Sequence, residues 1–392
     1  MYQAILLASY GGPETIDDIV PFLDRILSGK PVSSSRREAI IRRYKNLGGK
    51  SPLPNECRRF LSKLERRFAD IENSPQLYWG NLYSSPTFDN AFIQMEKDKI
   101  ESVLIFISSI FGSPQSCGRY RSSIISAFTR RSAEFKQKCS LTFIPPFFDL
   151  PAFHRAAADS LLSALAWDTL ENNPFTVLKD DKLPSCLLLF TAHSIPTLDG
   201  EKSQYRRQFL TATIATLQTY FNAPSFGIPK EIVNSRKNTS INVFPHSVTF
   251  SKLNLGKIPL DLEEKLKANS LDVAAVFQSR SGSPSSPWLE PDVKSFLREY
   301  QKKNPNLQSV IVFPIGFFFE NVETIFDLDI ELQTLCNELK LHYHRAKCVG
   351  STEQLVTSIF AMSQLPRSTF PNCHCTATYC NCDLSCRLRN TR

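Results

Sequence analysis

Near the carboxyl end of the chain, four acidic residues are spaced three, four and four positions apart: Glu320, Glu323, Asp327 and Glu331. These intervals match the helical repeat, so they predict a helix with one acidic face. A row of carboxylates on such a face can hold a divalent cation or pass it along the row. The alternative is an ordinary solvated face, because acids in a first helical turn also complement the helix dipole.

Apolar residues surround this acidic row. Phe317, Phe318 and Phe319 precede it, and Phe326 and Leu328 lie between its members. This pattern predicts that the acids are partly buried. Because a buried carboxylate needs a cation, a proton or a hydrogen-bond donor, the apolar surroundings favour a cation site.

Other groups that can do chemistry follow strand-like segments elsewhere in the chain. Tyr10 and two glycines follow the segment 4–8, His193 follows the segment 186–190, and Glu323 comes after the segment 309–314. In open parallel sheets, ligands bind beyond the carboxyl ends of the strands. We therefore expect a phenol, an imidazole and a carboxylate to converge. The glycine turn lacks the G-x-G-x-x-G spacing and does not indicate a dinucleotide site.

Short aliphatic segments alternate with longer segments of helical periodicity, and five of them read as strands: Ala4 to Ala8, Ser102 to Ile107, Cys186 to Phe190, Val273 to Phe277 and Ser309 to Phe313. This alternation predicts an α/β fold with parallel sheets covered by helices on both faces. A chain of 392 residues exceeds the size of one core. We therefore expect two domains, 1–150 and 151–365, with a polar surface insertion near 222–257 in the second and a separate tail at 366–392.

The composition, with 42% hydrophobic and 21% charged residues, is typical of a globular protein. No apolar segment is long enough to span a bilayer, and the strand-like segment 2–9 occupies the place of a signal peptide. We therefore expect a cytoplasmic protein without a transmembrane segment. The net charge of +8 comes from scattered Lys and Arg residues, which disfavours nucleic-acid binding.

Five of the eleven cysteines lie within the last twenty residues: Cys373, Cys375, Cys380, Cys382 and Cys386. In a reducing compartment, such crowding predicts a metal site rather than disulfides. Zinc and an iron–sulfur cluster both suit these thiolates, and a tail without any ligand is the remaining alternative.

The chain resembles the ferrochelatases from Tyr2 to about Val349. The resemblance rests on motifs that occur in the order found in that family: LLASYGGP (6–13), RY (43–44), GGKSPL (48–53), YWGN (78–81), TAHSIP (191–196), FQSRSG (277–282), PWLEPD (287–292), PIGF (314–317), ET (323–324) and DLD (327–329). So many motifs in one order do not arise by chance.

This resemblance implies two Rossmann-like domains with a porphyrin cleft between them, and an enzyme of haem biosynthesis that inserts ferrous iron into a porphyrin. A His and a Glu at the matching positions form the metal-site pair of the family, so catalytic and metal-binding roles are implied for His193 and Glu323. Asp327 and Glu331 then become a supporting acidic track that conducts metal in or protons out.

Porphyrin contacts are implied in the same way. Tyr10 matches a tyrosine that faces the macrocycle, and further contacts fall on Arg43, Tyr44, Ser51 and Tyr120. Metal insertion must remove two pyrrole protons while Fe²⁺ sheds water, which requires a base and a metal donor at the ring. From the sequence, His193 suits either role.

The opening LLASYGGPE, the YWGN motif and the PWLEPD motif most resemble the Gram-positive bacterial branch of the family, which uses coproporphyrin III. This implies Fe-coproporphyrin III as product, with protoporphyrin IX as the alternative substrate. Two more distant alternatives are a chelatase for another metal or tetrapyrrole and a non-catalytic haem-binding or iron–sulfur sensor. The neighbouring enzymes of haem synthesis are expected partners.

The chain departs from the family pattern at Glu320 and Asn321, where many members have Asp and His. Its tail resembles the segment that binds a [2Fe–2S] cluster in some ferrochelatases. That resemblance implies cluster ligands among Cys373, Cys375, Cys380 and Cys382.

Overall fold

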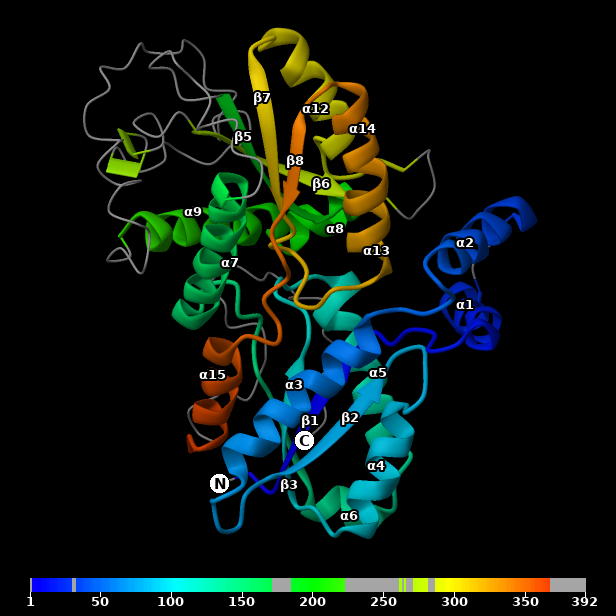
Figure 1. Ribbon diagram of the computed structural model, residues 1–392. Helices are drawn as coiled ribbons and strands as arrows, with labels where there is room; N and C mark the ends of the chain where they lie inside the picture. Colours follow the sequence, from blue (N-terminus) through cyan, green and yellow to red (C-terminus); the bar gives the residue numbers. More distant parts are fainter. Residues whose placement is uncertain are drawn as a thin grey trace.

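The computed structural model describes residues 2–29, 33–170, 185–222, 261–262, 264–265, 271–280 and 286–366. Apart from residue 222, the insertion expected near 222–257 lies outside the described residues, and so does the cysteine-rich tail from residue 367 onward. The chain forms two four-stranded parallel sheets, one in each half of the molecule in Figure 1.

The first sheet has the strand order β2-β1-β3-β4. Its strands are β1 (Ala4–Ser9), β2 (Gln76–Asn81), β3 (Ser102–Ile107) and β4 (Ser140–Phe143). The helices of this half are α1 (Ile19–Leu27), α2 (Ser34–Asn46), α3 (Leu53–Phe68), α4 (Phe88–Lys97), α5 (Arg119–Thr129) and α6 (Ala133–Lys138). Two shorter helical segments are η1 (Ile16–Asp18) and η2 (Pro114–Gly118).

The second sheet has the strand order β6-β5-β7-β8. Its strands are β5 (Ser185–His193), β6 (Leu271–Gln278), β7 (Leu307–Phe313) and β8 (His342–Arg345). The helices are α7 (Pro151–Leu170), α8 (Thr197–Lys202), α9 (Tyr205–Asn222), α12 (Val293–Lys303), α13 (Val322–Thr324), η5 (Ile325–Leu332), α14 (Gln333–Glu338) and α15 (Glu353–Ser363).

The predicted α/β architecture is confirmed, because all strand pairs are parallel and helices cover both faces of each sheet. Successive side chains of β1 point to opposite faces, so Ile5 and Leu7 enter one apolar core while Leu6 and Ala8 enter another. All five strands expected from aliphatic segments are present. The exact domain boundaries stay a prediction.

Aromatic packing joins the two halves. Phe318, from the segment that follows β7, packs edge-on against Phe60 of α3 at 6.0 Å, Phe106 of β3 at 5.3 Å and Phe147 at 5.3 Å between ring centroids. The C-terminal helix α15 also lies against α3 and α7 (Figure 1). These contacts fix the position of the β7 exit, which leads to Glu323, relative to the first sheet.

No helix within the described part of the chain is both long enough and apolar enough to cross a membrane.

Candidate functional site

The carboxyl ends of β1, β5 and β7 deliver the three groups that the sequence singled out. Tyr10 follows β1, His193 ends β5, and Glu323 follows β7 at the start of α13. Desolvation raises the pKa of the Tyr10 phenol well above its ordinary value, and the Glu323 carboxylate is close enough to raise it further. The structure therefore brings the predicted phenol, imidazole and carboxylate together, with the phenol supplied by one half of the molecule and the other two groups by the other half.

His193 and Glu323 form a close pair. Nε2 of His193 lies 3.6 Å from Oε2 of Glu323, and Nδ1 lies 2.5 Å from the main-chain oxygen of Ser194. Because a carbonyl only accepts hydrogen bonds, Nδ1 carries a proton and Nε2 faces the carboxylate. The two side chains are 26% and 49% exposed, so both remain accessible to a ligand.

Each member of the pair shifts the pKa of the other. Desolvation lowers the pKa of His193, but the Glu323 carboxylate, with help from the Ser194 carbonyl and Asp327, more than offsets this, so the pKa is raised from its usual value. Desolvation conversely raises the pKa of Glu323, and His193 together with Arg43 reverses the shift to a net lowering. Each group therefore stabilises the charged form of the other, and His193 becomes a neutral base only as the pH rises above its raised pKa.

A side-chain cap positions Glu323. Oδ1 of Asn321 accepts hydrogen bonds from the main-chain N–H groups of Glu323 at 2.8 Å and Thr324 at 3.0 Å. Asn is among the preferred N-cap residues because its short side chain satisfies these free donors. At Gly316, an added Cβ would lie 2.6 Å from Cα of Ala192, so only glycine lets the β7 exit pass this close to β5.

The acidic row continues along an unusual helix. Residues 325–332 form a π-helix, in which each N–H bonds five residues back, so roughly four to five residues make one turn. Spacings of four therefore place Glu323, Asp327 and Glu331 nearly above one another. Asp327 accepts a hydrogen bond from Oγ of Ser279, and Glu331 lies 2.5 Å from Nζ of Lys294.

Glu320 does not belong to this row, so the prediction of four acids on one helix face is wrong for this member. It precedes the Asn321 cap and turns toward Arg345, with 2.9 Å between Oε1 of Glu320 and Nη1 of Arg345. Arg345 also pairs with Asp329 through its Nε and Nη2 atoms at 2.5 and 2.9 Å. Oε2 of Glu320 accepts from the Thr324 hydroxyl, which ties this ion-pair network to the helix that carries Glu323.

Replacing Arg345 by methionine is expected to destabilise the protein by about 3–5 kcal/mol, because Glu320 and Asp329 would be left without their cation. The Arg345 side chain is only 13% exposed. The midpoint of denaturant unfolding measures the change. Arg298→Met is the matched control, since its pair with Glu338 is exposed on both sides and should change stability by less than about 1 kcal/mol. Equal shifts in the two variants would contradict the importance of the network.

Asp327 carries the most perturbed carboxyl of the row. Desolvation, with smaller contributions from the Glu323 and Glu331 charges, raises its pKa to about 6, although the Ser279 hydrogen bond and the Arg43 charge oppose the shift. The folded protein therefore binds a proton at Asp327 more tightly than the unfolded chain does. Ionisation of Asp327 therefore lowers the free energy of unfolding. This loss is absent below pH 3.8, the ordinary pKa, grows as the pH rises toward 6 and reaches its full size above pH 6.

Asp327→Asn is accordingly expected to be more stable than the unmodified protein at pH 7–8, by on the order of 2–3 kcal/mol, with no difference near pH 4. Asparagine retains an oxygen that can accept from Ser279. Urea unfolding across this pH range measures the difference, with the exposed Asp70→Asn as control. A stability gain that does not depend on pH would refute the assignment of this loss to Asp327.

A wall of aromatic side chains surrounds Tyr10. Its ring lies 4.8 Å from that of Tyr83 and 6.3 Å from that of Phe22, and Tyr44 and Tyr120 are close enough to raise its pKa. Tyr10 is 38% exposed, which leaves an aromatic surface facing the His193–Glu323 pair. Two of the predicted porphyrin contacts, Tyr44 and Tyr120, thus lie beside Tyr10.

The other predicted contacts lie at the edges of this wall. Ser51 is buried, its N–H donates to the Pro13 carbonyl at 2.8 Å, and it packs so closely on Gly12 that a Cβ there would lie 2.6 Å from its own Cβ. Arg43 lies 4.2 Å above the Phe326 ring and 3.9 Å from Glu331, so it contacts the acidic track directly.

Sequence reasoning missed three residues of this site: Tyr83, Ser279 and Lys294. Tyr83 is two positions beyond the YWGN motif, and Ser279 lies inside the FQSRSG motif, so proximity to a motif was their only signal. Lys294 carried no signal, because its contact with Glu331 joins residues 37 positions apart.

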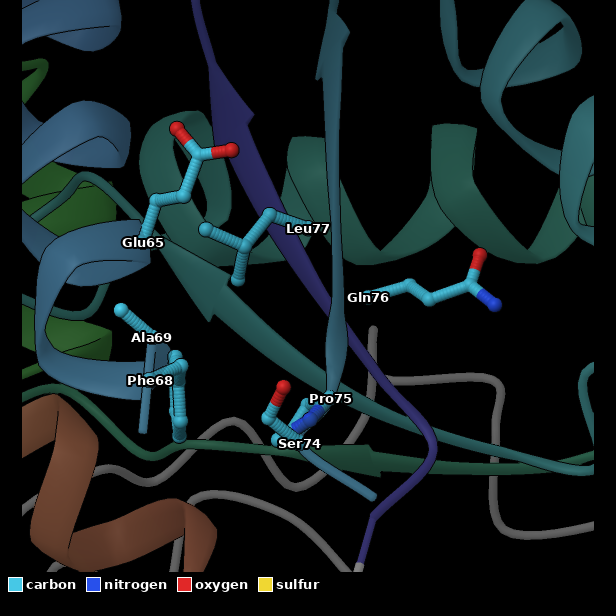
Figure 2. A pocket seen from close by; sticks show the side chains of 7 residues that line it. All are labelled: Glu65, Phe68, Ala69, Ser74, Pro75, Gln76 and Leu77. Carbon is cyan, nitrogen blue, oxygen red and sulfur yellow. The ribbon is translucent and has the colours of Figure 1, made fainter. Parts of the chain in front are cut away.

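A cavity of about 380 Å³ lies away from this site, at the amino end of β2 (Figure 2). In Figure 2 the Gln76 amide points away from the Glu65 carboxylate. The lining contains no imidazole, phenol or thiol, and consists of Glu65, Phe68, Ala69, Ser74, Pro75, Gln76 and Leu77. The cavity therefore offers no alternative to the His193–Glu323 pair for metal chemistry.

Within the described ranges, His, Cys, Asp and Glu side chains form no group of three or more that could hold a metal ion. The predicted cluster ligands Cys373, Cys375, Cys380 and Cys382 lie outside the described residues, so the cluster stays a prediction.

Comparison with known proteins places this site in a family. The family model described as Ferrochelatase matches residues 2–364. A ferrochelatase of Rhodopirellula baltica is 30% identical over 365 residues, which cover 93% of this chain and 86% of the relative. A coproporphyrin III ferrochelatase of Streptomyces griseus is 26% identical, with 91% and 84% covered.

Among solved structures, SirB from Bacillus subtilis with Fe³⁺ aligns with a TM-score of 0.45 and 12% identity, covering 95% of this chain and 97% of that one. The family match spans the strands, the His193–Glu323 pair and the Tyr10 wall. The chain belongs to the ferrochelatase family, whose members are metal chelatases.

Proposed function

We propose that this protein inserts Fe²⁺ into coproporphyrin III and so forms Fe-coproporphyrin III in haem b biosynthesis. The observation that carries the proposal is the convergence of His193, Glu323 and Tyr10, with 3.6 Å between the imidazole and the carboxylate. A macrocycle lying against Tyr10 would present its pyrrole nitrogens to this pair. The substrate ion would then meet the Glu323 carboxylate, an oxygen donor that suits Fe²⁺.

His193 is the proton acceptor in this proposal. The Ser194 carbonyl holds the proton on Nδ1, so the lone pair of the neutral ring lies on Nε2 and faces Glu323. A base is most effective when its pKa lies near the operating pH, and Glu323 raises the pKa of His193 from a value already near neutral. Nε2 would take one pyrrole proton as the metal enters. Passing that proton on to the acidic track would free Nε2 to accept the second pyrrole proton.

Glu323 and the acidic track have complementary roles. The lowered pKa of Glu323 keeps it ionised, so it can accept the incoming cation and stabilise the imidazolium that forms. Asp327 and Glu331 continue in line behind it and would guide the metal in or the released protons out. Tyr10 has a raised pKa and stays an uncharged phenol on the opposite side of the site.

Coproporphyrin III is the preferred substrate because relatives named coproporphyrin III ferrochelatase, from Streptomyces griseus and Corynebacterium glutamicum, match over 91% and 93% of the chain. The net charge of +8 also suits a tetra-anionic porphyrin. The relative from Rhodopirellula baltica is named only as a ferrochelatase. Protoporphyrin IX therefore remains the second candidate.

The test is an anaerobic assay in which purified protein receives Fe²⁺ and either porphyrin in parallel. The proposal expects rapid loss of porphyrin fluorescence with coproporphyrin III and a lower kcat/KM with protoporphyrin IX. A preference for protoporphyrin IX would overturn the substrate assignment. Metallation of neither porphyrin would overturn the proposed activity.

The cysteine-rich tail is proposed to bind a [2Fe–2S] cluster outside the catalytic path. Four thiolates suffice for such a cluster, and residues 373–392 contain five cysteines. Anaerobically purified protein is expected to show visible cluster absorption and acid-labile sulfide, and both signals should disappear in a variant truncated after residue 366. Bound zinc in place of sulfide would contradict the cluster.

A further inference from the structure

Ser279, the residue that follows β6, has an unusual main-chain conformation beside the acidic track. Its φ angle is 61°, in the left-handed region that residues other than glycine rarely adopt. The same residue donates a hydrogen bond from Oγ to Oδ2 of Asp327, which lies 48 positions away in the sequence. A strained backbone that places one side chain in contact with a site residue indicates a constraint on that side chain.

The hydrogen bond between Ser279 and Asp327 has a fixed direction. An ionised carboxylate only accepts, so the single hydroxyl proton of Ser279 points toward Asp327. The lone pairs of the same oxygen face Gln278, whose Nε2 lies 3.5 Å away and only donates. Gln278 is 2% exposed, so its amide stays inside the protein. The result is a row of donors that runs from Gln278 through Ser279 to Asp327.

The same strand end also holds His193. Gln278 pairs in register with His193 on the neighbouring strand β5, and the main-chain oxygen of Gln278 accepts from the N–H of Ser194 at 2.7 Å. The main-chain oxygen of Ser194 in turn accepts from Nδ1 of His193. Residues 278–279 therefore fix the proposed base on one side and Asp327 on the other.

The contacts of Asp327 suit a proton acceptor. The Ser279 hydroxyl proton takes up one carboxylate oxygen and would repel a cation that bridged both oxygens, whereas Oδ1 keeps its lone pairs. The Asp327 charge acts on both His193 and Glu323, so the carboxylate lies near the pair. Without the Ser279 hydroxyl, this carboxylate would turn toward Arg43, whose charge also acts on it.

We propose that Ser279 is a positioning residue that holds Asp327 as the acceptor of the proton that leaves His193. In this step the N–H bond at Nε2 of His193 breaks and an O–H bond forms at Oδ1 of Asp327, directly or by way of the Glu323 carboxylate. Nε2 regains the lone pair that takes the second pyrrole proton. The inference rests on the proposed function, because it assigns the outlet for the protons that metal insertion releases.

The test is anaerobic single-turnover metallation of coproporphyrin III by the full-length protein, at saturating Fe²⁺, in H₂O and in D₂O. Ser279→Ala removes the hydroxyl and is expected to lower the rate at least about tenfold, since a displacement of about 1 Å can cost about a hundredfold. The ratio of the rates in H₂O and D₂O should rise, because proton transfer becomes the slow step. The Kd for porphyrin and the steady-state KM for Fe²⁺ should stay unchanged.

Ser279→Gly separates positioning from stability. Glycine adopts a φ of 61° without strain, so this variant should unfold at a higher urea concentration than Ser279→Ala. Both variants lack the hydroxyl, so both should metallate equally slowly. Ser279→Asn keeps a donor and tolerates the left-handed conformation, so it should recover part of the rate.

Lys340→Gly is the matched control, because Lys340 also has a left-handed φ, of 55°, and is exposed. It should metallate at the unmodified rate. A rate that follows stability, with Ser279→Gly faster than Ser279→Ala, would overturn the proposal, and so would an unchanged isotope ratio. A raised Kd for porphyrin or a raised KM for Fe²⁺ would also overturn it, since Ser279 would then act on a substrate. Failure of the proposed function is distinguishable, because the unmodified protein would then bind porphyrin without metallating it.

Discussion

Replacing His193 by alanine is expected to lower kcat for iron insertion by about 10²–10⁴-fold, the usual contribution of a positioned acid–base group. The variant loses the only imidazole that faces Glu323 within the described residues. Porphyrin binding should persist, because the aromatic wall around Tyr10 does not depend on this ring. Loss of turnover with retained affinity would identify His193 as a group of the chemical step.

Single-turnover metallation under anaerobic conditions, followed by porphyrin fluorescence, separates this effect from product release. His342→Ala is the matched control, since His342 is an exposed imidazole on β8. It should metallate at the unmodified rate. Retained turnover in His193→Ala would remove His193 from the mechanism, and loss of porphyrin affinity would instead give it a role in substrate binding.

Local patterns were sufficient to predict most of the fold. β1 and β3 are continuous aliphatic segments because helices bury both of their faces, and such segments are visible in the sequence. Three strands were not predicted: β2, β4 and β8. All three lie at sheet edges. β4 and β8 have only four residues each, and β2 mixes Leu, Tyr and Trp with Gln, Gly and Asn, so none of them shows a long aliphatic pattern.

The candidate site was predictable only where its residues lie at strand ends. The positions of Tyr10, His193 and Glu323 followed from the rule that ligands bind beyond the carboxyl ends of parallel strands. Spacing alone could not show that Glu320 turns away to Arg345, because this pair depends on where β8 lies relative to the β7 exit. The hydrogen bonds from Arg25 and Arg119 to Tyr83 were equally hidden, since they join α1 and α5 to the loop after β2.

The division of groups between the two halves of the molecule has a mechanistic consequence. The half that contains the first sheet contributes Tyr10 and the phenols beside it, whereas the other half contributes the His193–Glu323 pair. A porphyrin between them would have one face against Tyr10 and its nitrogens near Glu323. The metal would then approach from the acidic track, on the side opposite to the phenol.

Replacing Glu323 by glutamine is expected to lower kcat/KM for Fe²⁺ on the order of 10²-fold or more, because the isosteric amide removes the negative charge from the metal side of the site. It should also change the pH dependence. The Glu323 carboxylate raises the pKa of His193, so the pKa should fall in the variant. Since His193 must be neutral to accept a proton, the acidic limb of the kcat/KM profile should move to lower pH.

The free energy of unfolding should depend on pH in the directions that the pKa shifts of His193 and Glu323 predict. The raised pKa of His193 stabilises the folded protein fully below pH 6.5, and this contribution is lost as the pH rises through the folded-state value. The lowered pKa of Glu323 stabilises the fold above pH 4.5, and this contribution is lost as the pH falls through the folded-state value. The mutation should therefore destabilise the protein most between these limits.

Urea unfolding across the pH range and a pH series of kcat/KM measure both effects. Glu338→Gln, at an exposed pair with Arg298, is the matched control and should leave the two profiles unchanged. An acidic limb that does not move in Glu323→Gln would mean that Glu323 does not set the protonation of His193. The carboxylate would then act on the metal alone, and the pair could not function as one proton-accepting unit.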